Sequence, residues 1–187
     1  MSTLVRAGDL IGLPVVSIAT GEDIAEVRDV VYDASDHRLV GFTLNKRGFL
    51  AGKAKDVLDA DSVASVGADA VTVDDESAVS QRDEGPRALE RPARLVSVIG
   101  DRALTSDGND LGEVVDVVLS TGPDPEAVGY ELDAGRDHVF VPISAQIAVS
   151  GENLLLPPEA TAFVRDDLAG FGAAVDDYRA ALDGGSR

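Results

Sequence analysis

Cysteine is absent from this sequence of 187 residues. The absence excludes disulfides, thiolate catalysis and cysteine-ligated zinc or iron–sulfur centres. Tryptophan is also absent, and aromatic residues make up only 4% of the chain. The apolar content is nevertheless 44%, which is enough for a packed core. Such a core must be built from Val, Leu, Ile and Ala.

Positive charge is scarce as well. The chain has 16 Lys and Arg against 34 Asp and Glu, so its net charge is −18. Such a field repels DNA, RNA and anionic lipid surfaces, and we expect no DNA partner. No apolar run approaches the roughly 18 residues that a membrane span needs, and the N-terminal segment lacks the pattern of a signal peptide. The sequence therefore predicts a cytoplasmic protein without a membrane span.

One motif occurs twice in the chain. Residues 21–31 read GEDIAEVRDVV, and residues 108–118 read GNDLGEVVDVV. Shorter matches flank the motif: Ile11-Gly12 with Ile99-Gly100, and Val-Gly-aromatic at residues 40–42 and 128–130. A period of about 88 residues is too long for a solenoid repeat and suits a small domain. The sequence predicts two copies of one domain, which favours binding or scaffolding over a single catalytic site.

Short apolar runs separated by turn signals predict a mainly β organisation. The expected strands of the first copy are residues 13–19, 24–32, 38–44, 55–58 and 70–73, with a helical turn within residues 59–66 as an alternative. Those of the second copy are residues 95–99, 103–105, 111–120, 127–132, 138–141 and 154–156. Such strands favour a small barrel or a sandwich. The expected boundaries are residues 1–79 for the first domain, 80–93 for a linker, 94–157 for the second domain and 158–187 for a tail.

The tail has a different pattern. Its apolar residues recur every three or four positions, at Val164, Leu168, Phe171, Val175, Tyr178 and Leu182. This period predicts an amphipathic helix that begins at Pro157-Pro158-Glu159 and is softened or split by Gly170 and Gly172. Because the stripe spans fewer than three heptads, we expect it to dock in cis across a barrel. A homodimer through the same helix is the alternative to a monomer.

The order of residues in each copy resembles the PRC-barrel domain family. Each copy has an apolar-Gly pair, then Gly-x-Asp-apolar-x-Glu-Val-x-Asp-Val-Val, then Val-Gly-aromatic. The resemblance covers about residues 4–74 and 95–157 and leaves out the tail. It implies two tandem six-stranded, mainly antiparallel barrels that serve in protein docking and share no catalytic residues. Because each copy is small for independent stability, the barrels should pack on each other or on the tail.

The repeated motif supplies the candidate structural residues: Gly21, Asp23, Glu26 and Asp29, with Gly108, Asp110, Glu113 and Asp116. Asp29 and Asp116 break the alternation of polar and apolar residues, because each falls in phase with its flanking valines. A break at the same place in both copies favours a β-bulge, which small barrels need in order to curve. The alternative is that both carboxylates point inward to a backbone amide or a ligand.

A positively charged segment, residues 46–55, interrupts the acidic chain. It contains all the lysines, and no acidic residue occurs between Asp36 and Asp56. The candidate partner-binding residues are Lys46, Arg47, Phe49, Lys53 and Lys55. Two interpretations remain open: a docking loop for an acidic surface or a phosphate, and a solvated hairpin tip that keeps a sheet edge from aggregating.

The remaining motifs do not predict chemistry. Residues 48–53 are too short for a phosphate-binding P-loop and lack its Ser or Thr, and residues 107–113 lack the spacing of a calcium loop. His37 and His138 occupy different places in the repeat, have no partners at metal-ligand spacing, and read as lone surface histidines. We therefore predict no catalytic residue, no metal and no cofactor.

These features together predict a non-enzymatic cytoplasmic adaptor or scaffold that docks a protein partner. The resemblance also implies an alternative, because PRC-barrel domains occur in ribosome maturation factors as well as in the H subunit of photosynthetic reaction centres. That alternative is a factor in RNA metabolism or associated with the ribosome, or else a module that binds a small ligand. The net charge argues against direct contact with bulk RNA.

Overall fold

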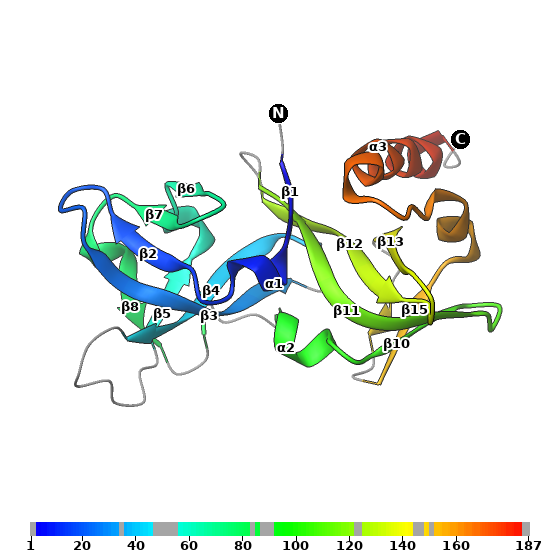
Figure 1. Ribbon diagram of the computed structural model, residues 1–187, viewed down its shortest axis with the longest axis horizontal. Coiled ribbons are helices and arrows are strands. Elements are labelled where there is room, and N and C mark those ends of the chain that lie inside the picture. The colour runs from blue at the N-terminus through cyan, green and yellow to red at the C-terminus, as the bar shows by residue number, and fades with distance from the viewer. Residues whose placement is uncertain are drawn as a thin grey trace.

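Two β-sheets, one built mainly from each half of the chain, lie side by side along the long axis of the molecule (Figure 1). The structure is a computed structural model that describes residues 3–33, 36–46, 56–82, 85–86, 92–121, 125–143, 148–149 and 152–184. We call residues 1–91 the first half and residues 92–187 the second half.

The first sheet has eight strands. They are β2 (Pro14–Ser17), β3 (Asp23–Asp33), β4 (Leu39–Lys46), β5 (Asp56–Asp59), β6 (Ser65–Val66), β7 (Val71–Val73), β8 (Val79–Gln81) and β9 (Pro92–Arg94). Their order is β6-β7-β2-β3-β4-β5-β8, with β9 beside β3. The turns η1 (Ala60–Ser62) and η2 (Glu76–Ala78) are short 3-10 helices, and η1 lies where the alternative helical turn was expected.

The second sheet has seven strands. They are β1 (Leu4–Arg6), β10 (Arg102–Thr105), β11 (Asp110–Ser120), β12 (Glu126–Asp133), β13 (His138–Pro142), β14 (Ala148–Val149) and β15 (Asn153–Leu156). Their order is β13-β12-β11-β10-β15-β14, with β1 beside β11. Equivalent strands pair in the two sheets, including one parallel pair in each, β2 with β7 and β10 with β15.

The mainly β fold with a C-terminal helix is confirmed, but the sheets differ from the expected barrels. They have eight and seven strands instead of six, and each mixes parallel with antiparallel pairs. Within the described residues, the two end strands of neither sheet pair with each other, so neither barrel is closed. One extra strand in each sheet has a clear source, because each sheet contains a strand from the other half.

The halves exchange their first strands. β1 of the first half pairs with β11 of the second, with Val5 opposite Leu119. β9, which opens the second half, pairs in the equivalent register with β3 of the first, with Ala93 opposite Tyr32. The exchange is therefore reciprocal, and the copies are not two barrels that merely touch.

A helical turn follows each exchanged strand, α1 (Ala7–Leu10) and α2 (Leu95–Val98), and both lie between the sheets (Figure 1). The strand expected at residues 95–99 is therefore wrong. A short apolar run fits a buried helical turn as well as a strand. Here the Ser97 hydroxyl accepts a hydrogen bond from the Arg94 N–H at 3.2 Å, which helps to close the turn. Gly12 and Gly100, with φ of 84° and 89°, redirect the chain after each turn.

The starts of β4 and β12 also pair across the junction. The Leu39 N–H donates to the Pro125 carbonyl at 2.8 Å, and the Ala127 N–H donates to the His37 carbonyl at 2.6 Å. Arg38 and Glu126 lie opposite each other between these bonds. Leu39 and Ala127 are equivalent in the repeat, so an approximate two-fold axis relating the copies passes between Arg38 and Glu126.

The two halves share one core. The largest cluster of buried apolar side chains draws on both halves and includes Ala7, Val27, Phe42, Val114, Tyr130 and Leu132. Sharing suits the small size of each copy, since a domain of this size buries too little surface to be very stable alone. The expected packing of the copies on each other is thus present, with a closer connection than the sequence indicates.

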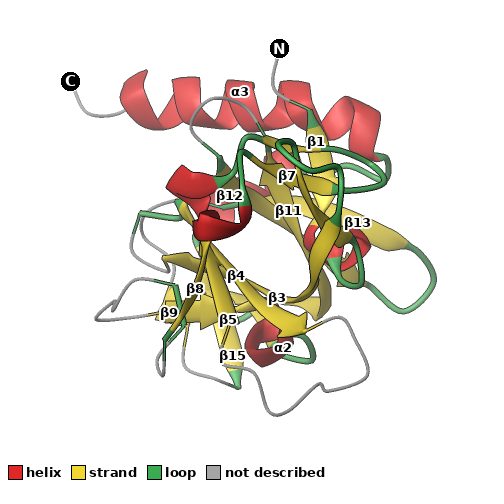
Figure 2. Cartoon of the chain, turned by 90° about the vertical axis from the view of Figure 1, so that its left-hand side faces the viewer, coloured by secondary structure: helices red, strands yellow, loops and turns green. Residues whose placement is uncertain are grey.

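The tail forms η3 (Pro158–Phe163) and then α3 (Leu168–Gly184), which is continuous through Gly170 and Gly172 (Figure 2). The α-helix therefore begins later than expected and is not split. Its first turn is closed by Asp167, whose carboxylate accepts a hydrogen bond from the Gly170 N–H at 2.7 Å. An Asp at this position offsets the low helix propensity of the glycines.

α3 docks in cis on the outer face of the second sheet. Phe171 is fully buried, and its ring centroid lies 5.6 Å from that of Phe140 on β13. Ahead of α3, Arg165 exchanges backbone hydrogen bonds with Phe140 and so covers the edge of β13. The stripe is buried at Phe171, Val175 and Tyr178, whereas Leu182 is 39% exposed.

Candidate interaction surfaces

The positively charged segment lies almost wholly outside the described residues. Arg47, Phe49, Lys53 and Lys55 all fall there. Only the backbone of Lys46 is described, where it ends β4 opposite Ala25 of β3. The segment therefore remains a sequence prediction that belongs to the β4–β5 connection of the first half.

The motif residues shape the hairpins that lead into β3 and β11. Gly21 and Gly108 have φ of 72° and 92°, which only glycine adopts without strain. Asp23 and Asp110 begin the two strands. The Asp110 carboxylate pairs with Arg102 at 2.5 Å and accepts the Gly112 N–H at 3.1 Å, contacts that lower its pKa.

The bulge expected from the phase break is present in both copies. The pairing register shifts between Val27 and Asp29 on β3, and between Val114 and Asp116 on β11. The bulged carboxylates also accept backbone hydrogen bonds: Asp29 from the Val30 N–H at 3.0 Å, and Asp116 from the Val117 N–H at 2.7 Å. The bulge and a carboxylate–amide contact thus occur together.

Asp116 reaches beyond its own half. Its carboxylate accepts the N–H of Gly8 in α1 at 2.9 Å. Burial raises the pKa of Asp116, an effect that the Gly8 and Val117 N–H groups oppose and that the negative charges of Glu131 and Asp9 reinforce. A side chain at residue 8 would collide with this carboxylate, since a Cβ there would lie 2.5 Å from Asp116 Oδ2. The motif therefore fastens the exchanged segment to the second sheet.

A second polar contact fastens the same segment. Arg6 on β1 donates to the Glu131 carboxylate on β12, with 2.5 Å between Nε and Oε2, and Glu131 also lies 3.0 Å from His138 Nδ1. Burial raises the pKa of Glu131, but the hydrogen bonds from Arg6 and His138 outweigh it, and the pKa is lowered overall. The Arg6 guanidinium lies 5.3 Å from the centroid of the Phe140 ring.

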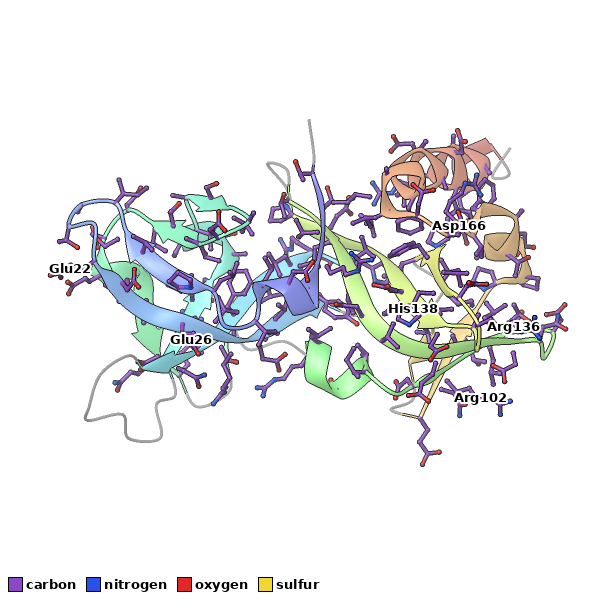
Figure 3. The ribbon with its side chains drawn as sticks, in the orientation of Figure 1. Glu22, Glu26, Arg102, Arg136, His138 and Asp166 are labelled. Carbon is purple, nitrogen blue, oxygen red and sulfur yellow. The ribbon has the colours of Figure 1, made fainter. Side chains whose placement is uncertain are left out.

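Figure 3 shows His138 on the second half, whereas Glu22 and Glu26 lie toward the opposite end of the molecule. The Arg6–Glu131–His138 group therefore lies away from Glu22 and Glu26 of the first half. Sequence reasoning missed the group because Glu131 replaces Thr43 of the first copy, and no local pattern links Arg6 to a residue so distant in the chain.

A third polar group lies at the junction of the halves. The hydroxyls of Tyr32 and Tyr130 are 3.3 Å apart, and each tyrosine is only 1% exposed. Burial raises the pKa of both tyrosines, and the pKa of Tyr130 reaches about 12. Asp101 lies close enough for its negative charge to add to this rise in both tyrosines. Sequence reasoning could have found this group by comparing the copies, because Asp101 stands where the first copy has Leu13.

Two isoleucines at equivalent places in the copies are exposed. Ile11 is 40% exposed and Ile99 is 43% exposed, each at the end of a helical turn and before a glycine. The carboxylate of Glu113 lies beside Gly100, with Oε1 3.9 Å from the position of a Cβ there. The equivalent residues of the first copy are Gly12 and Glu26, so both copies share an isoleucine and a glutamate.

The two histidines differ from each other. His138 begins β13 as expected, and its side chain is 56% exposed. His37 is only 9% exposed and has a φ of 62°, so reading it as a surface residue was wrong. The junction covers it, because its carbonyl pairs with Ala127 of the other half. Among the described residues, no group of three His, Asp or Glu side chains could hold a metal ion.

Comparison with known families agrees with this geometry. The model of the PRC-barrel domain matches residues 2–79 and again residues 93–160. The chain belongs to the PRC-barrel domain family. Both matches include the exchanged segment of their own copy, β1 with α1 in one and α2 in the other. Comparison with curated proteins finds no match to this sequence. No helix in the described part of the chain is long and apolar enough to cross a membrane.

Proposed function

We propose that this protein is a non-enzymatic cytoplasmic adaptor that docks a protein partner through its PRC-barrel surfaces. Membership of the PRC-barrel family supports a docking role. The shared core and the exchanged strands support it further, because they hold the two copies in one fixed arrangement. Such a scaffold displays its two equivalent surfaces without an ordering cost on binding.

The observation that carries this proposal is the repeated exposure of Ile11 and Ile99. Most exposed apolar residues differ between the copies, as Ile18, which is 61% exposed, is replaced by Ser106. The isoleucines are kept although the residue two positions further on changes from Leu13 to Asp101. An exposed isoleucine presented twice, with the Glu113 carboxylate beside Gly100 in the second copy, suits a partner that offers apolar side chains together with a basic one.

The proposal is tested by affinity capture from the source organism with quantitative mass spectrometry. The double variant Ile11→Ser/Ile99→Ser should lose the partner that the wild-type protein enriches. The matched control is Ile18→Ser, which removes a more exposed isoleucine that has no counterpart in the other copy. A second variant, Lys53→Ser/Lys55→Ser, tests whether the positively charged segment takes part.

Three outcomes are distinguishable. Loss of one enriched protein in the isoleucine variant, with retention in the control, supports the adaptor. Enrichment dominated by ribosomal components that depends on the same isoleucines supports the ribosome-associated alternative. Equal enrichment by all the variants would show that neither surface binds a partner and would contradict the proposal.

A further inference from the structure

The two copies present the same pairing surface, which raises a question of specificity. Each copy contributes a strand to the sheet of the other copy, and a helical turn follows that strand. The starts of β4 and β12 also pair with each other across the two-fold axis. The same contacts would let a first copy pair with the first copy of another molecule. Like pairing would link separate chains instead of closing one chain on itself.

The side chains at the junction are not symmetric, however. On one side of the axis lie Tyr32, Tyr130 and Asp101, which we call the polar triad. Tyr32 comes from the first half and the other two from the second. All three are buried, with exposures of 1%, 1% and 5%, and the tyrosine hydroxyls are within hydrogen-bond distance. Oδ2 of Asp101 is buried with no hydrogen-bond partner among the described residues.

The equivalent positions on the other side carry Leu119, Phe42 and Leu13, which we call the apolar triad. Leu119 comes from the second half and the other two from the first. Leu119 and Phe42 are buried in the shared core, and Leu13 packs against it. All three positions are polar on one side of the axis and apolar on the other. Each side is therefore uniform in polarity, although it combines residues of both copies.

We propose that the polar triad makes the two copies pair with each other and not with their own kind. If two first copies paired, Tyr32 would face Phe42 and Leu13, and its hydroxyl would be buried without its tyrosine partner. If two second copies paired, Asp101 and Tyr130 would face Leu119 and lose the other hydroxyl. A buried polar group that loses its partner weakens an association by about tenfold or more. Like pairing meets this penalty at both of its junctions.

Charge on the axis acts in the same direction. Arg38 and Glu126 are equivalent in the repeat and lie directly opposite each other in the paired arrangement. Like pairing would place arginine opposite arginine, or glutamate opposite glutamate, which is unfavourable in an antiparallel pair. Both side chains also have partners on their own side, Arg38 with Asp36 and Glu126 with Arg179. The charge difference therefore reinforces the triad without replacing it.

Because the chain has no cysteine, a cysteine introduced at the two-fold axis can report which copies pair. With Arg38→Cys alone, the introduced thiols meet only when two first copies pair, and oxidation then links two chains. With Arg38→Cys/Glu126→Cys, the thiols meet within one chain, and oxidation gives a linked monomer. The second form is the control that residues 38 and 126 do lie opposite each other. Each form is unfolded in denaturant, refolded at high concentration under reducing conditions and then oxidised.

The Arg38→Cys reporter is compared in three backgrounds. The test background replaces each member of the polar triad with its equivalent: Tyr32→Leu, Tyr130→Phe and Asp101→Leu. A milder background, Tyr32→Phe/Tyr130→Phe, removes only the two hydroxyls and keeps the ring shapes. The matched control, Leu13→Ile/Leu119→Ile, changes the apolar triad without changing its polarity. Circular dichroism checks that each background folds.

We expect little linked dimer in the wild-type and control backgrounds. The test background should give about tenfold more, because like pairing no longer buries an unpaired polar group. The milder background should give an intermediate increase. The proposal is wrong if the milder background folds and gives no more linked dimer than the control background, because the triad then does not select the pairing. This holds whether or not the test background folds. The experiment does not depend on a docking partner, so its outcome is independent of the proposed function.

Discussion

Replacing Phe171 with Ala should test how firmly the tail is bound to the second sheet. The ring is fully buried between α3 and the sheet, beside Phe140. It lies directly on the backbone of β12, because a Cβ on Gly129 would be 2.3 Å from Phe171 Cζ. The backbone of β12 is paired on both sides and cannot fill the space that the ring leaves. The substitution therefore removes a buried side chain and creates a cavity.

Substitutions of buried Phe by Ala cost about 3–5 kcal/mol of unfolding free energy. We expect the lower end, about 3 kcal/mol, because α3 lies at the surface and can settle toward the sheet. For a chain of this size, 1 kcal/mol corresponds to roughly 2–4 °C, so the melting temperature should fall by about 6–12 °C. Urea unfolding followed by circular dichroism measures the first value, and scanning calorimetry measures the second.

The control is Leu182→Ala in the last turns of the same helix. Leu182 is 39% exposed, and its truncation should cost less than about 1 kcal/mol. The molar mass from light scattering should remain that of a monomer in both variants and after deletion of residues 158–187. Phe171→Ala with the stability of the control would refute the cis packing of α3. A dimer that becomes an equally stable monomer on deletion would show that the helix pairs between chains.

Three further predictions concern polar groups and glycines. Asp101→Asn should stabilise the protein at neutral pH, because burial, and then the charge of Glu152, raise the pKa of Asp101. The stability of the wild-type protein therefore falls as pH rises through that pKa. In urea unfolding, the advantage of the variant should disappear at low pH, where Asp101 is protonated. Glu131→Gln should lower the unfolding free energy by about 1–2 kcal/mol near neutral pH, because it loses the charge-assisted bonds to Arg6 and His138. Since the pKa of Glu131 is lowered, this loss should shrink as pH falls through the acid range. A loss that stays constant with pH would contradict this prediction. Gly41→Ala should destabilise more than Gly21→Ala in thermal melts, because a Cβ at Gly41 would lie 2.0 Å from the Leu58 carbonyl oxygen, whereas nothing lies within 4 Å at Gly21.

The sequence predicts the architecture of each copy because strand patterns and turn residues are local. The long strands at residues 24–32 and 111–120 match β3 and β11, and Gly21 and Gly108 mark the turns before them. The bulges were also predictable, because Asp29 and Asp116 break a period that is otherwise regular. These features depend on residues close together in the chain.

The exchange of strands was not predictable in this way. Residues 4–6 read as the start of the first copy, and nothing nearby indicates that they pair with residues 118–120 of the second. The partner of an exchanged strand is set by the geometry of the junction, which joins residues far apart in the chain, such as Val5 with Leu119 and Ala93 with Tyr32. The helical turn at Leu95–Val98 was misread for a related reason, since an apolar run of this length has no period that distinguishes helix from strand.

The exchange gives the repeated motif a role that a single copy would not suggest. Asp116 holds the N–H of Gly8, and Glu131 holds Arg6, so the same few residues of β11 and β12 shape a bulge and retain a strand from the other half. Any force that loosens β1 therefore disturbs both sheets, because α1 continues from it toward β2 through Gly12. Ile11 stands at this link, and Ile99 stands at the equivalent link through α2. A partner bound at either isoleucine would contact the segment that joins the two sheets, and its binding energy would stabilise the paired arrangement that the polar triad selects.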